Sequence, residues 1–121
     1  MLLKDFYKVN KLETVESKTT VAITINKDHA IFKGHFPGNP VTPGVCMMQI
    51  IKELTEEIVS EKLFMQSSSN IKFMAIINPD KTPDLVLTLE ISKTDIGYKV
   101  KNISKFEDTV ALKLTTNYKV L

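Results

Sequence analysis

A single histidine lies inside the segment of this chain that is richest in proline and glycine. Residues 34–45 read GHFPGNPVTPGV, with three prolines and three glycines around His35. Each proline fixes φ and removes a backbone donor, and each glycine permits a turn or a close approach to a ligand. An imidazole also titrates near neutral pH, so it suits proton transfer. The segment therefore predicts a rigid loop that presents His35.

The loop runs directly into a helical pattern, and this junction offers a second chemical group. Pro43 suits a helix start, and the backbone amides of Gly44 and Val45 then lie at the helix N-terminus. Unpaired N–H groups and the helix dipole stabilise negative charge there. An imidazole beside such amides is what removal of a proton α to a thioester carbonyl requires. From these residues alone, a purely structural role for the loop histidine stays open.

The rest of the chain predicts one long helix and an antiparallel sheet. Apolar residues recur at helical spacing from 44 to 62, whereas residues 18–27 alternate as a half-buried strand does. Four later segments combine strand-forming residues with turn residues between them: 70–77, 84–92, 98–106 and 109–120. The serines at 67–69 are interpreted as a turn. A sheet must wrap a helix of this kind, so the fold class is α+β.

The helical pattern also predicts which residues face the core. The expected apolar stripe consists of Val45, Met48, Ile51, Leu54 and Ile58. Residues 45–48 form an unbroken apolar first turn, so the helix is expected to enter the interior at its N-terminal end. Cys46 belongs to this turn, and we expect it to lie in the core.

Composition bounds the class of protein. With 121 residues, 43% of them hydrophobic and 25% charged, the chain is expected to form one domain over residues 1–121. A net charge of +2 with scattered lysines does not favour nucleic acid. No apolar run reaches the ~18 residues of a membrane span, and no signal-peptide pattern opens the chain. One cysteine excludes an internal disulfide, so a reducing cytoplasm is expected.

No metal or nucleotide site is indicated. His29 and His35 are the only histidines, and no cluster of Cys, His or Asp surrounds them. The glycines lack the spacing of a phosphate-binding loop, so no nucleotide cofactor is expected. His29 is expected to end the strand before the loop or to face solvent.

Residues 34–45 resemble the active-site signature of the β-hydroxyacyl-(acyl carrier protein) dehydratases. The resemblance is dense over residues 28–54 and continues weakly at 70–73 and 78–79. It implies the hotdog fold, in which an antiparallel sheet wraps one long central helix. It also implies a homodimer with an acyl tunnel at the interface, and acyl carrier protein as the partner. The substrate is then a thioester on the carrier's phosphopantetheine, with no other cofactor.

The same resemblance assigns roles to residues of this chain. His35 matches the catalytic histidine of the family, and an amide at Gly44 or Val45 would polarise the thioester carbonyl. Phe36 and Phe73 become candidates for the wall of the tunnel. A typical member also begins with a longer segment, including a Pro-His-Arg-like turn that residues 1–16 lack. Part of the tunnel or of the carrier-binding surface is therefore expected to differ.

The chain departs from the family at the catalytic carboxylate. The family places a glutamate five residues after the glycine of its Pro-Gly-Val segment, and here that position is Gln49. An amide has no proton to give in the normal pH range, and general acid–base groups contribute roughly 10²–10⁴-fold. Glu53 stands one helical turn later, where the family commonly has glutamine. We hypothesise that Glu53, directly or through a water, supplies the missing carboxylate; a merely solvated glutamate is the alternative.

Three functions follow from this combination. The first is a dehydratase-like enzyme for 3-hydroxyacyl thioesters of acyl carrier protein, serving fatty-acid or polyene and polyketide-type synthesis, with His35 as base and Gln49 orienting the β-oxygen. The second is a catalytically impaired subunit that pairs with a fully equipped hotdog partner in a hetero-oligomer. The third is a hotdog thioesterase that holds a nucleophilic water at Gln49.

Overall fold

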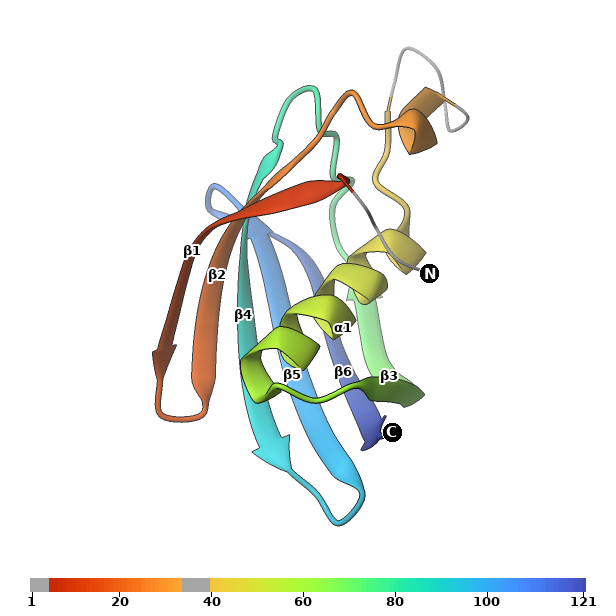
Figure 1. The fold of residues 1–121 in the computed structure, drawn as a ribbon. Coiled ribbons are helices and arrows are strands. Elements are labelled where there is room, and N and C mark those ends of the chain that lie inside the picture. Colours follow the sequence, from red (N-terminus) through yellow and green to blue (C-terminus); the bar gives the residue numbers. More distant parts are fainter. Residues whose placement is uncertain (1–4, 34–39) are drawn as a thin grey trace.

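The computed structural model describes residues 5–33 and 40–121, so His35 and Phe36 lie outside the described residues. One α-helix lies against one face of a twisted antiparallel sheet (Figure 1). The elements in chain order are β1 (Tyr7–Val15), β2 (Lys18–Ile25), the 3-10 turn η1 (Ala30–Lys33), α1 (Gly44–Val59), β3 (Leu63–Phe73), β4 (Asp84–Lys93), β5 (Gly97–Phe106) and β6 (Thr109–Val120). The predicted α+β class is confirmed.

The sheet has six strands in the order β1-β2-β4-β5-β6-β3. Its face toward α1 carries the alternating apolar residues of the central strands, such as Val21 and Ile23 on β2 opposite Leu87 and Leu85 on β4. These side chains are almost fully buried, because the helix covers them. Strands that alternate in this way bury one face and leave the other to solvent.

Helix α1 begins where the sequence predicts it but ends earlier. Pro43 is the N-cap residue in extended conformation, and Ser60 ends the helix because its φ of 58° is left-handed. The buried side also differs from the expected stripe. Val45 is 64% exposed, whereas the buried residues are Cys46, Met47, Ile50, Ile51, Leu54 and Thr55. The burial predicted for Cys46 is confirmed, and that predicted for Val45 is wrong.

Strand β1 was not among the predicted elements. Its register against β2 shifts between Val9 and Lys11, which places an extra residue, Asn10, in the strand. Such a bulge breaks the two-residue alternation by which strands are identified in a sequence. Val9 and Leu12 consequently share the face turned toward α1 although three positions separate them. Tyr7 lies on the same face, opposite Ile25.

The predicted turn at residues 67–69 is wrong, because these serines lie inside β3. They pair with Asn117, Thr116 and Thr115 of β6. The side chains form cross-strand hydrogen bonds, with 3.1 Å between Ser68 Oγ and Thr116 Oγ1 and 3.2 Å from Asn117 Nδ2 to Ser67 Oγ. β3 is an edge strand, where polar residues and bulges are tolerated.

Candidate active site

The N-terminal end of α1 presents backbone N–H groups. The amides of Cys46 and Met47 both donate to the carbonyl of Pro43, at 3.0 and 3.3 Å. Among the described residues, no acceptor is found for the amides of Gly44 and Val45. Two donors at the positive end of the helix dipole are suited to an oxygen that gains negative charge. The structure therefore provides the helix start that the sequence predicts.

An aromatic ring from the edge strand packs against this helix end. A Cβ placed on Gly44 would lie 2.5 Å from Cζ of Phe73, so only glycine lets the ring approach so closely. The Phe73 side chain is still 57% exposed. Beside it lies a groove of about 430 Å³, lined by residues 41–44, Met47 and residues 73–77. A mostly apolar groove that reaches the helix amides has the character of an acyl-binding site.

One polar atom stands out in the wall of this groove. The hydroxyl of Thr42 is buried and has no hydrogen-bond partner within the part of the chain that the structure describes. The backbone N–H of Thr42 is satisfied, since it donates to the Ile77 carbonyl at 2.9 Å. A buried hydroxyl without a partner is costly, so a ligand that bonded to it would be stabilised.

Gln49 and Glu53 are brought together with a residue that sequence reasoning missed. Gln49 Nε2 donates to Glu53 Oε2 at 3.0 Å. The phenol of Tyr7, on β1, donates to Glu53 Oε1, also at 3.0 Å. Each carboxylate oxygen of Glu53 thus accepts a hydrogen bond, one from the same helix and one from the sheet. Glu53 is half-buried, not a fully solvated residue of an amphipathic helix.

The pKa of Tyr7 is raised far above the usual value of a phenol. Burial is the largest cause, followed by the negative charge of Glu53, the hydrogen bond to it, and the charge of Glu57. Tyr7 therefore keeps its proton at neutral pH and remains a hydrogen-bond donor. The sequence did not indicate Tyr7 as a site residue, because Tyr7 lies in β1, a strand whose bulge breaks the alternating pattern.

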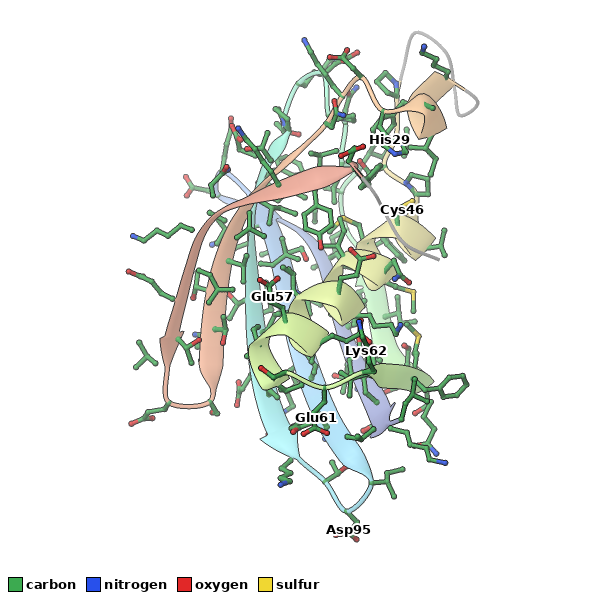
Figure 2. The ribbon with its side chains drawn as sticks, in the orientation of Figure 1. His29, Cys46, Glu57, Glu61, Lys62 and Asp95 are labelled. Atoms are coloured by element: carbon green, nitrogen blue, oxygen red, sulfur yellow. The ribbon has the colours of Figure 1, made fainter. Side chains whose placement is uncertain are left out.

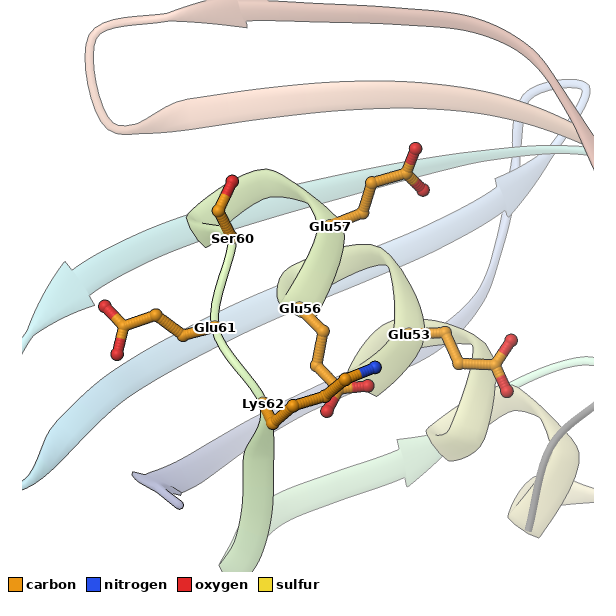
Figure 3. A pocket seen from close by; sticks show the side chains of 6 residues that line it. All are labelled: Glu53, Glu56, Glu57, Ser60, Glu61 and Lys62. Atoms are coloured by element: carbon orange, nitrogen blue, oxygen red, sulfur yellow. The ribbon is translucent and has the colours of Figure 1, made fainter.

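The C-terminal half of α1 has a second hollow, which is acidic. Glu53, Glu56, Glu57, Ser60, Glu61 and Lys62 line it (Figure 3). The glutamates extend in different directions, and Glu53 points away from Glu61. Glu56 accepts a hydrogen bond from the backbone N–H of Leu63 at 2.8 Å, and Glu61 accepts one from Tyr98, also at 2.8 Å. In residues 5–33 and 40–121 no group of side chains is arranged to hold a metal.

His29 and Cys46, labelled in Figure 2, have structural surroundings. β2 ends at Ile25, so the expectation that His29 ends the strand is wrong. Its ring is partly exposed and makes a T-shaped contact with Phe6. Its Nδ1 accepts a hydrogen bond from the backbone N–H of Ile31 at 3.1 Å, which stabilises η1. Burial raises the pKa of the Cys46 thiol, which disfavours a reactive thiolate.

Comparison with known proteins places the chain in a family. A family model described as ApeI-like, ApeI dehydratase, matches residues 11–113. The chain belongs to the ApeI-like dehydratase family. It is also 34% identical over 112 residues to the 3-hydroxyacyl-[acyl-carrier-protein] dehydratase FabZ of Lactobacillus helveticus, covering 86% of this chain and 74% of the relative. A FabZ from a Caulobacter species is 31% identical, and the match spans 74% of this chain but only 58% of that protein.

Solved structures with this fold include dehydratases and thioesterases. A chain of the dehydratase heterocomplex ApeI:P from Xenorhabdus doucetiae superposes with a TM-score of 0.75 at 16% identity, covering 93% of this chain and 96% of that chain. A hypothetical thioesterase from Streptococcus pneumoniae, solved with coenzyme A, gives a TM-score of 0.65 at 15% identity, covering 99% and 91%. These likenesses confirm the predicted hotdog fold.

Membrane-spanning helices are absent from the described part of this ApeI-like chain: none of its helices is long and apolar enough.

Proposed function

We propose that this ApeI-like protein dehydrates 3-hydroxyacyl thioesters carried by acyl carrier protein. The observation that carries the proposal is the family match over residues 11–113, which includes both the His35 loop and helix α1. The geometry of α1 supports it, because the amides of Gly44 and Val45, Gln49 and Glu53 lie along one stretch of the helix. The apolar groove beside Gly44 supports an acyl or pantetheine chain as the ligand.

In the proposed reaction, His35 removes a proton from the carbon α to the thioester carbonyl. The electron pair moves onto the carbonyl oxygen, which the amides of Gly44 and Val45 stabilise. The double bond then forms between the α and β carbons as the β-hydroxyl leaves, and this group takes up a proton to depart as water. Gln49 holds the β-oxygen. The proton comes either from the protonated His35 or, where the Glu53 carboxyl is itself protonated, from Glu53, directly or through a water.

Turnover by the purified protein alone tests this proposal. It is assayed with 3-hydroxyacyl carrier thioesters from C4 to C14, following the absorbance of the enoyl product and, in parallel, the release of free thiol. We expect enoyl product without free thiol, and a loss of about 10²–10⁴-fold in His35→Ala. Full activity in His35→Ala would remove His35 from the mechanism. Free thiol as the main product would replace dehydration with thioester hydrolysis.

A heteromeric enzyme is the second candidate function. Gln49 stands where the family has its acid, and the structural neighbour named above is a chain of a dehydratase heterocomplex. In this version a partner hotdog subunit contributes the carboxylate to a site shared between the two chains. Gln49→Glu separates the candidates: restored activity of the isolated chain favours the heteromeric enzyme. An active homodimer with the native Gln49 contradicts it.

A further inference from the structure

The bond between Gln49 and Glu53 fixes which way the Gln49 amide faces. An ionised carboxylate only accepts hydrogen bonds, so the atom of Gln49 that lies 3.0 Å from Glu53 Oε2 must be the NH₂ nitrogen. The carbonyl oxygen of the amide is consequently turned away from Glu53. A glutamine without such a neighbour could turn either its donor or its acceptor outward, whereas here the side turned away from Glu53 is the acceptor.

Tyr7 holds the carboxylate that sets this orientation. Its phenol bonds the other oxygen of Glu53 at 3.0 Å and comes from β1, so Glu53 is tied to the sheet as well as to its own helix. The ring has its place because Tyr7 lies opposite Ile25 on the sheet face toward α1. Anchoring both oxygens restricts the rotation of the Glu53 side chain. The orientation of Gln49 therefore depends on a residue from another element.

From this chain of contacts we infer that Tyr7 and Glu53 are positioning residues that make Gln49 a hydrogen-bond acceptor for the β-hydroxyl of the substrate. The inference rests on the proposed function. It predicts a preference for 3-hydroxyacyl over 3-oxoacyl thioesters, because a 3-hydroxyacyl thioester donates its hydroxyl hydrogen to the Gln49 carbonyl. A 3-oxoacyl thioester offers only an acceptor at this position and leaves the amide oxygen unpaired. Sites that hydrogen-bond a substrate hydroxyl discriminate strongly against analogues that lack it.

The test compares two thioesters of pantetheine. The KM of the 3-hydroxybutyryl thioester and the competitive inhibition constant of the acetoacetyl thioester are measured. The ratio of the inhibition constant to the KM gives the preference for the 3-hydroxy compound. We expect the native protein to favour the 3-hydroxy compound by at least about fivefold, because an unpaired polar group costs about 1–3 kcal/mol. In Glu53→Gln, residue 53 can donate as well as accept, so Gln49 can reverse its amide. The preference should then fall toward unity.

Tyr7→Phe removes only the phenol oxygen and should lower the same ratio several-fold. The matched control is Tyr98→Phe, which breaks the corresponding tyrosine–glutamate bond to Glu61 at 2.8 Å and should leave the ratio unchanged. A spectroscopic readout needs no substrate. Because Glu53 helps to raise the pKa of Tyr7, Glu53→Gln should shift one phenol ionisation, followed by absorbance in the ultraviolet, to lower pH.

The outcomes separate this inference from the proposed function. If the native protein dehydrates the 3-hydroxy thioester but the ratio is unchanged in Glu53→Gln and Tyr7→Phe, the positioning role is overturned and the function stands. If Glu53→Gln abolishes turnover while the binding preference, then measured as the ratio of the two dissociation constants, stays constant, Glu53 acts as the acid instead. If the native protein neither binds nor converts either thioester, the proposed function fails, and the inference fails with it.

Discussion

Two tyrosine–glutamate bonds tie α1 and the segment just after it to the sheet, with different consequences. At the middle of α1, Tyr7 of β1 donates to Glu53 at 3.0 Å. Just past the C-terminus, Tyr98 of β5 donates to Glu61 at 2.8 Å. Among the residues that the structure describes, the first glutamate alone also bonds a second side chain of the proposed site, Gln49. The same chemical pair therefore also fixes the amide of Gln49 in the first case and only fastens the chain to the sheet in the second.

The surroundings of the two tyrosines explain this difference. Burial is the main cause of the raised pKa of Tyr7, whereas for Tyr98 the main cause is the hydrogen bond to Glu61. A bond shielded from water holds its partners more firmly than one beside solvent. The effect of a tyrosine–glutamate bond therefore depends on how far it is buried and on whether its carboxylate also bonds a third side chain.

The largest expected effect concerns the glycines at the two ends. Gly97→Ala, next to Tyr98, would press a Cβ against the backbone oxygen of Tyr118, which cannot move aside. Gly44→Ala would meet only the ring of Phe73, which is exposed and can rotate. We expect losses in unfolding free energy of about 3 kcal/mol for Gly97→Ala and about 1 kcal/mol or less for Gly44→Ala. Urea titration measures both; equal losses would contradict the contrast between the two ends.

The next effect is kinetic. Gln49→Leu removes the amide at nearly constant volume and should lower kcat/KM by about 10- to 100-fold, the equivalent of about 1–3 kcal/mol. Glu61→Gln, at the other end of the helix, should change kcat/KM by less than about twofold. Enoyl formation from a 3-hydroxyacyl carrier thioester measures both variants. A large kinetic loss in Glu61→Gln would show that the acidic hollow belongs to the site.

A smaller effect is expected on stability when each bond is cut. Tyr7→Phe should lower the unfolding free energy by about 1 kcal/mol, because the carboxylate of Glu53 loses a donor in partly buried surroundings. Tyr98→Phe should have a smaller effect, since water can replace the phenol beside Glu61. Chemical denaturation followed by circular dichroism provides the comparison. The reverse order would mean that the C-terminal anchor is the stronger one.

The smallest effect is a change of stability in alkali. The folded protein holds the phenol proton of Tyr7 above its ordinary pKa of about 10, whereas the unfolded chain releases it there. The contribution is therefore fully present below about pH 10 and is lost as the pH rises further. Denaturation midpoints at about pH 9 and pH 11 should differ less in Tyr7→Phe than in the native protein. Burial also raises the pKa of Tyr118. Part of the loss of stability in alkali should therefore remain in both proteins.

Much of the fold could be predicted because hydrophobic periodicity records burial directly. The alternation on β2 and β4 and the helical spacing after Pro43 predicted the elements that form the core. β1 escaped because the bulge at Asn10 breaks the alternation. The serines of β3 lie in a strand and not in the predicted turn, because an edge strand can satisfy polar side chains across to β6, as Ser68 does with Thr116. The strand propensity of a residue does not reflect such cross-strand partners.

The candidate site divides in the same way. Residue types and spacing predicted the helix amides of Gly44 and Val45 and placed Gln49 and Glu53 one turn apart. The roles of His35 and Phe36 stay predictions, because both lie outside the described residues. Tyr7 carried no signal of its own, since it stands in a strand that the pattern did not indicate. It is 46 residues from Glu53 in sequence, a separation that no local pattern bridges.

By itself, the sequence determined the fold class and the family resemblance, because burial periodicity and a dense motif are both local properties of the chain. It also determined that an amide replaces a carboxylate at Gln49. Only the tertiary structure decided which way that amide faces. The register of β1 against β2 turns Tyr7 toward α1. The carboxylate of Glu53 then accepts one hydrogen bond from Tyr7 and one from Gln49. Folding brings together the partners that set the orientation of a side chain, so this orientation cannot be predicted from composition and spacing.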